Sequence, residues 1–123
     1  MTRDDRQARV LTWARDTFGE VAVNPTERVS RFVEEAIELA QACGYPPERI
    51  VELVGYTYGR PPGEVGQEVG GVSVSLLALC ESLGISAEVC EARETERVTS
   101  ITREVFRRKH QAKVEAGVAE PMA

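Results

Sequence analysis

Two segments of this sequence carry acidic side chains at a spacing suited to holding a metal ion and positioning a water molecule. The first segment, RVSRFVEEAIELAQAC, contains Glu34, Glu35 and Glu38, and the second, GQEVGGVSVSLLALCESLGI, contains Glu68. Residues three or four positions apart are neighbours on a helix, so Glu35 and Glu38 lie one turn apart. Mg²⁺ prefers oxygen ligands, so the pattern predicts a divalent-cation site between two acidic helices.

The apolar residues of the first segment place these acids at the edge of its expected buried face. At about 100° per residue, Glu35 falls at the margin of the apolar arc, Glu38 about 60° beyond it and Glu34 further round. The arc consists of Val29, Phe32, Val33, Ala36, Ile37 and Ala40. Arg28 and Arg31 lie on the acidic side, so the alternative is a solvated face joined by salt bridges.

The second segment also has an acidic stripe beside an apolar arc. Glu64, Glu68, Gly71 and Ser75 share the stripe, and the arc contains Val65, Val69, Val72, Leu76 and Leu79. Gly66, Gly70 and Gly71 lie in the first turns, although each helical glycine costs about 0.5 to 1 kcal/mol relative to alanine. The glycines indicate close approach of a ligand or backbone, or simply tight helix packing.

Together, RFVEEAIELAQACG and GQEVGGVSVSLLALCESLGI resemble the MazG-like nucleoside triphosphate pyrophosphohydrolases, over residues 24–86. The resemblance implies an all-α helical domain that forms a homodimer or homotetramer. It also implies Mg²⁺-dependent hydrolysis of a nucleoside triphosphate to the monophosphate and pyrophosphate, with Mn²⁺ as a possible substitute.

The resemblance assigns roles to individual acids. Glu35 and Glu38 match the family's ExxE metal ligands, and Glu68 matches the first acid of its ExxD. Glu34 matches an acid beside the metal ligands that orients the attacking water, and it is the candidate catalytic base. Gly71 stands where the family has the aspartate, so this chain lacks one of four expected carboxylates.

A basic cluster near the C-terminus offers contacts for the phosphates. Arg107, Arg108 and Lys109 are the candidate substrate-binding residues, since arginine can bind phosphate through two parallel hydrogen bonds. The alternative is that these cations favour the negative end of their own helix. His110, the only histidine, is expected at the surface.

Two other functions stay open on this evidence. With Gly71 in place of the acid, the chain could bind nucleotides without cleaving them. In a different class, a helical interaction module would use its acidic faces to contact a protein partner.

The composition indicates a single domain over residues 1–115, followed by a flexible tail over 116–123. The 20 acidic and 15 basic residues give a net charge of -5, so we expect no nucleic-acid or membrane partner. Three separated cysteines fit reduced thiols in the cytoplasm, and the charged N-terminal residues do not resemble a secretory signal.

The apolar spacing predicts an all-α bundle of four to five helices. The expected ranges are 3–18, 24–43, 47–58, 64–83 and a last helix from 86 past 107. Glu27 is expected to complete a capping box with Asn24. Ala8, Leu11, Trp13 and Ala14 are core candidates, and the apolar fourth helix is expected at the centre of the bundle.

Overall fold

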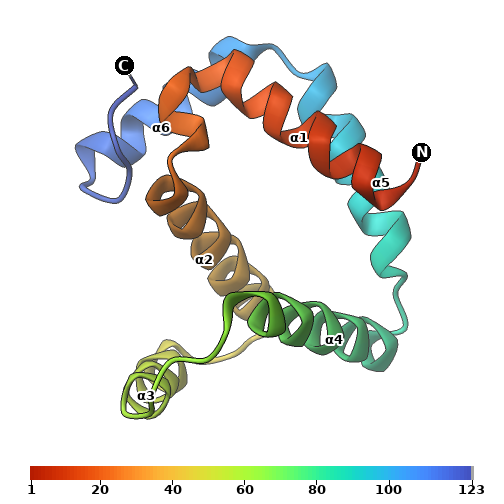
Figure 1. The fold of residues 1–123 in the computed structure, drawn as a ribbon, viewed down its shortest axis with the longest axis vertical. Helices are drawn as coiled ribbons and strands as arrows, with labels where there is room; N and C mark the ends of the chain where they lie inside the picture. The colour runs from red at the N-terminus through yellow and green to blue at the C-terminus, as the bar shows by residue number, and fades with distance from the viewer. Residues whose placement is uncertain (123) are drawn as a thin grey trace. The chain divides into compact units, whose positions relative to one another are not determined.

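A computed structural model describes residues 1–122, which form six α-helices and a short 3₁₀ helix and contain no strand (Figure 1). The predicted all-α class is therefore confirmed. The elements are α1 (Arg3–Phe18), η1 (Glu20–Val23), α2 (Pro25–Ala42), α3 (Pro47–Tyr58), α4 (Val65–Leu83), α5 (Ala87–Ser100) and α6 (Arg103–Glu115). None of these helices is by itself long and apolar enough to cross a bilayer.

Local sequence explains most of the helix boundaries. Thr2 Oγ1 accepts a hydrogen bond from the Asp5 N–H at 3.1 Å, and the Asp5 carboxylate accepts one from the Thr2 N–H at 2.9 Å. This reciprocal capping box begins α1. At the start of α4, the Glu64 carboxylate accepts hydrogen bonds from the N–H groups of Gly66 and Gln67. Helix α4 ends at Gly84, whose φ of 70° is left-handed.

The predicted last helix is wrong, because the chain breaks after Ser100 and divides it into α5 and α6. Near the break, the Thr99 hydroxyl donates to the Thr95 carbonyl at 2.8 Å, and the Ser100 hydroxyl donates to the Arg97 carbonyl at 3.0 Å. Side chains that bond their own backbone compete with helix propagation, and the β-branched residues Val98, Thr99, Ile101 and Thr102 weaken it further. Residues 1–122 therefore form six α-helices rather than four to five.

The chain divides into two compact units, residues 1–40 with 95–122 and residues 41–94. In the first unit, α1 packs against η1 and α6. Trp13 makes edge-to-face contacts with Phe18 and Phe106, at ring-centroid distances of 5.8 and 5.1 Å. Ala14 is buried as predicted, whereas Ala8 and Leu11 are exposed. The aromatic cluster is the core that joins α1 to α6.

The second unit contains α3, α4 and the start of α5, and it has almost no buried core. No residue of α3 is buried, and Cys80 is the only buried residue of α4. The prediction that α4 is buried within the chain is therefore wrong, since Val69 is 62% exposed. A single chain supplies too few apolar neighbours to cover a helix that is apolar on most sides.

Candidate functional site

One face of α2 carries four charged residues that line a pocket of about 540 Å³ in the first unit. Glu27, Arg31, Glu34 and Glu38 recur every three or four positions, so they form a continuous stripe along the helix. The remaining lining comes from Ser30, Val33, Ile37 and residues 117–120. The pocket therefore brings together two of the predicted acids, Glu34 and Glu38.

Glu34, the candidate catalytic base, lies between two cations. Its Oε1 accepts a hydrogen bond from Lys113 Nζ at 2.7 Å, and Arg31 Nη1 lies 3.5 Å from the same oxygen. About a quarter of the Glu34 side chain is exposed, so the carboxylate still reaches the pocket. These ion pairs match the alternative of an acidic face joined by salt bridges, and they fix the position of Glu34.

Glu27 is buried in this cluster, with only 1% of its surface exposed. Its Oε1 lies 3.3 Å from Arg31 Nε, and its Oε2 accepts a hydrogen bond from the Glu120 N–H at 3.1 Å. The predicted capping box at the start of α2 is therefore wrong. Asn24 Oδ1 accepts a hydrogen bond from the Thr26 N–H at 2.9 Å. The Glu27 carboxylate instead points inward, to Arg31 and to the Glu120 N–H.

His110 is also buried, at 4% exposure, so its predicted surface position is wrong. Its ring packs against Phe18 with a centroid distance of 5.2 Å. Its Nε2 lies 2.6 Å from the Glu120 carbonyl oxygen, which can only accept, so Nε2 carries a proton and donates. Phe106 and His110 are four positions apart, and this helical spacing is the sequence signal that could have indicated a shared buried face.

Arg28 lies next to Glu27 in the sequence, and burial lowers the pKa of its guanidinium. The charge of Glu27 opposes this shift and the charge of Arg31 adds to it. The start of α2 is therefore a compact cluster of opposite charges.

The predicted phosphate contacts on α6 do not line the pocket. Arg107 Nε donates to the Thr17 carbonyl at 2.7 Å and so ties α6 to the end of α1. Lys109 Nζ lies 5.8 Å from the centre of the Phe106 ring, and Arg108 is exposed. The cation of α6 that contacts a pocket acid is instead Lys113.

Glu68 and Gly71 belong to the second unit, on α4. A Cβ atom added at Gly63 would lie 2.9 Å from Glu68 Oε1, so the carboxylate lies against the loop before the helix. At Gly70 and Gly71 an added Cβ would meet nothing within 4 Å, apart from the backbone of the helix itself. No other segment of residues 1–122 approaches these two glycines closely, so tight packing within the described chain does not explain why they are glycine.

Residues 1–122 contain no group of three or more histidine, cysteine or acidic side chains placed to hold a metal ion. Glu35 is exposed and does not line the α2 pocket. The carboxylate oxygens that Glu34 and Glu38 bring to the pocket nonetheless suit Mg²⁺. This ion is commonly bound by one or two carboxylates together with water and substrate phosphates. The three thiols are free, with Cys80 buried and Cys43 and Cys90 exposed.

Comparison of the chain with protein-family models, with curated proteins and with solved structures found no match.

Proposed function

We propose that this chain is a Mg²⁺-dependent hydrolase that converts a ribo- or deoxyribonucleoside triphosphate to the monophosphate and pyrophosphate. The observation that carries the proposal is the pocket that Glu34 and Glu38 line together. Its volume of about 540 Å³ is in the range of small-molecule sites. The resemblance of the two acidic segments to MazG-like pyrophosphohydrolases supplies the reaction.

In this proposal Glu35 and Glu38 would hold Mg²⁺ from one turn of α2, and the resemblance to the MazG-like enzymes also assigns Glu68, in the second unit, as a metal ligand. Bound Mg²⁺ would neutralise charge on the phosphates and make water a better nucleophile, and Mn²⁺ would substitute for it. Two carboxylates with substrate phosphates are sufficient for a Mg²⁺ site, so the glycine at position 71 does not exclude this arrangement.

Glu34 would orient the attacking water and accept its proton. Lys113 and Arg31 hold the carboxylate in one position, and positioning is a large part of what a general base requires. Arg107, Arg108 and Lys109 would bind phosphate oxygens, with Arg107 using the guanidinium N–H groups other than its Nε.

The natural partner that we propose is a second copy of this chain, in a homodimer or homotetramer. The exposed apolar residues of α3 and α4 in the second unit supply a surface for such a partner: Val51, Leu53, Val54, Val65, Val69, Val72, Val74 and Leu77.

The test of the enzyme proposal is release of pyrophosphate from a panel of triphosphates. We expect activity that requires Mg²⁺ or Mn²⁺ and collapses in Glu38→Ala. Glu20→Ala is the matched control, because Glu20 is an exposed glutamate of η1 that lies outside the pocket lining and outside the proposed subunit surface. Unchanged activity in Glu38→Ala, or no activity with any triphosphate and either metal, would reject the proposal.

Two alternatives each have an observation in their favour. The missing carboxylate at Gly71 favours a nucleotide-binding protein without turnover. The exposed apolar residues of α3 and α4 favour a helical interaction module. Calorimetric titration with a non-hydrolysable triphosphate and Mg²⁺ separates them, because only the nucleotide-binding protein would give a saturable signal.

A further inference from the structure

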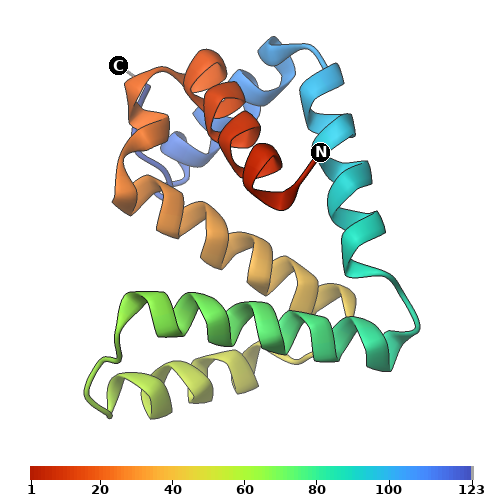
Figure 2. The same cartoon turned by 45° about the vertical axis from the view of Figure 1, so that its right-hand side comes forward.

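A loop of residues 59–64 joins α3 to α4 in the second unit (Figure 2). Local contacts give this loop a defined path. The guanidinium carbon of Arg60 lies 4.5 Å from the centre of the Tyr56 ring, on the last turns of α3. Pro61 and Pro62 follow, and the ring of each proline fixes its own φ. The loop therefore brings a restrained stretch of main chain to the start of α4.

Gly63, at the end of this loop, is a glycine that its backbone conformation does not require. The positive φ values of residues 1–122 belong to four other glycines, so the φ of Gly63 lies outside the left-handed region. Residues with a side chain adopt a negative φ without the steric cost that a positive φ brings. What glycine supplies at position 63 is therefore the space that a side chain would fill.

That space is taken by the side chain of Glu68. A Cβ atom built on Gly63 would lie 2.9 Å from Glu68 Oε1, 3.3 Å from its Cδ and 3.5 Å from its Cγ. The first distance is too short for a non-bonded contact of a Cβ atom, so a methyl group and this carboxylate cannot both keep these places. Helical side chains lean toward the N-terminus of their helix, which is why Glu68, in the first turn of α4, reaches back to the loop.

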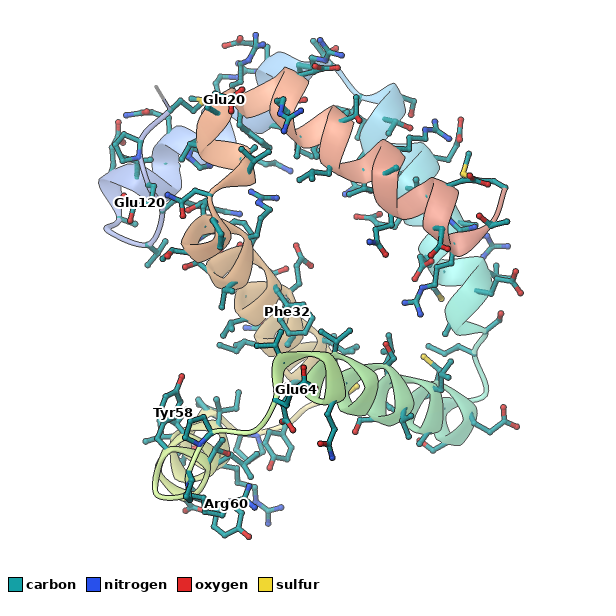
Figure 3. The ribbon with its side chains drawn as sticks, in the orientation of Figure 1. Glu20, Phe32, Tyr58, Arg60, Glu64 and Glu120 are labelled. Carbon is teal, nitrogen blue, oxygen red and sulfur yellow. The ribbon has the colours of Figure 1, made fainter. Side chains whose placement is uncertain are left out.

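The two acids in this part of the chain differ in what holds them (Figure 3 labels Glu64). The Glu64 carboxylate accepts hydrogen bonds from the N–H groups of Gly66 and Gln67, so it is occupied by capping the helix. The Glu68 side chain is exposed, and it forms no ion pair or hydrogen bond with another of residues 1–122. The loop at Gly63 is therefore the contact that sets where this carboxylate lies.

We propose that Gly63 is a positioning residue for Glu68. With no side chain at position 63, the Glu68 carboxylate lies against the α3–α4 loop, and this placement lets it serve as a metal ligand. The effect on metal binding rests on the proposed function, in which Glu68 is such a ligand, whereas the placement itself does not. A side chain at position 63 moves the carboxylate and leaves α4 intact, because the atoms that must move are the end of a flexible side chain.

The test adds one methyl group to the full chain in two places. Gly63→Ala displaces the carboxylate, and Gly55→Ala is the matched control, because a Cβ added there meets nothing within 4 Å beyond its own helix backbone. Each variant is made with Glu68 and again with Glu68→Gln. The Kd for Mn²⁺ is measured by electron paramagnetic resonance without nucleotide, and Tm is measured on every variant. In the parent, proton NMR measures the Overhauser effect between the Gly63 Hα and Glu68 Hγ protons.

We expect the Overhauser effect to be present in the parent. Gly63→Ala should weaken Mn²⁺ binding about tenfold, the lower end of what loss of an orienting contact costs a metal ligand. Gly55→Ala should leave the Kd unchanged. In the Glu68→Gln background Gly63→Ala should have no further effect, because the carboxylate through which it acts is gone. The Tm of Gly63→Ala should not fall below that of the parent.

Three results would overturn the positioning role. They are an absent Overhauser effect, a Kd for Gly63→Ala equal to that of Gly55→Ala while Glu68→Gln weakens binding, or the same tenfold loss with Glu68→Gln already present. The second of these leaves Glu68 as a metal ligand, so it rejects the role of Gly63 and not the proposed function. Unchanged Mn²⁺ binding in Glu68→Gln alone would remove Glu68 from the metal site, and with it the role of Gly63.

Discussion

Lys113 Nζ donates a hydrogen bond of 2.7 Å to Glu34 Oε1, although 79 residues separate the two in the sequence. The contact joins the last helix to the acidic stripe of α2 in the first unit. It also gives the candidate base one fixed cationic neighbour, with Arg31 as the second.

A double-mutant cycle on this pair should detect a modest coupling. About a third of the Lys113 side chain and a quarter of the Glu34 side chain are exposed, so we expect Lys113→Ala and Glu34→Ala to couple by about 0.5 to 1 kcal/mol in the free energy of unfolding. Lys109→Ala, on the same helix, should show no coupling with Glu34→Ala. Zero coupling for Lys113, measured by denaturant unfolding, would show that the pair does not persist in solution.

Glu27→Ala should destabilise the chain far more than loss of an exposed acid. The substitution leaves Arg31 and the Glu120 N–H without their carboxylate in a buried setting, which costs about 3 to 5 kcal/mol. Glu20→Ala is the control, since Glu20 is exposed and lies 3.9 Å from Arg15. That control should change stability by only about 0.5 kcal/mol. Similar urea midpoints for the two variants would contradict the buried cluster.

Gly71→Asp should increase Mg²⁺ affinity if position 71 is the missing ligand. An added Cβ there meets nothing within 4 Å beyond its own helix backbone, so the side chain fits without displacing its neighbours. Gly71→Asn is the matched control, because it has the same shape without the charge. Isothermal titration with Mg²⁺ should show tighter binding for the aspartate only. Equal affinities in both variants would remove position 71 from the metal site.

The cap of α4 should make stability depend on pH at the acidic end. Hydrogen bonds from the Gly66 and Gln67 N–H groups lower the pKa of Glu64 from its ordinary value of 4.5. A lowered folded-state pKa adds stability above 4.5, and this stability is lost as the pH falls through the folded value. We therefore expect the Tm difference between the parent and Glu64→Ala to be largest near pH 7 and to shrink at low pH. A constant difference across this range would mean that the charged cap contributes nothing.

Charges on the exposed apolar residues of α4 should separate the proposed subunits. Val69→Asp with Val72→Asp should convert the oligomer to a monomer in light scattering, because buried unpaired carboxylates are costly at an interface. Val10→Asp, on α1, is the control and should leave the mass unchanged. A parent chain that is already monomeric at micromolar concentration would reject the second copy as partner.

The sequence by itself determined where most helices begin and end. The bounds of α1 and α3 match their predicted ranges, and those of α2 and α4 agree within one residue, because glycines, prolines and capping side chains act locally. The same reasoning failed at residues 101–102, where side-chain hydrogen bonds to the backbone broke a helix that the apolar spacing had extended. The acidic stripe of α2 was also predicted, since it depends only on helical spacing.

Only the tertiary structure decided what these side chains meet. The neighbours of Glu34 and Glu27 come from α6 and residues 118–120, and contacts over such separations leave no periodic signal in the sequence. The burial of His110 likewise depends on Phe18 from another helix. Apolar spacing predicted a buried face for α2 and α4, but spacing cannot say whether the covering surface comes from the same chain. Those faces stay exposed here, and the α4 face belongs to the surface where we propose that a second copy binds.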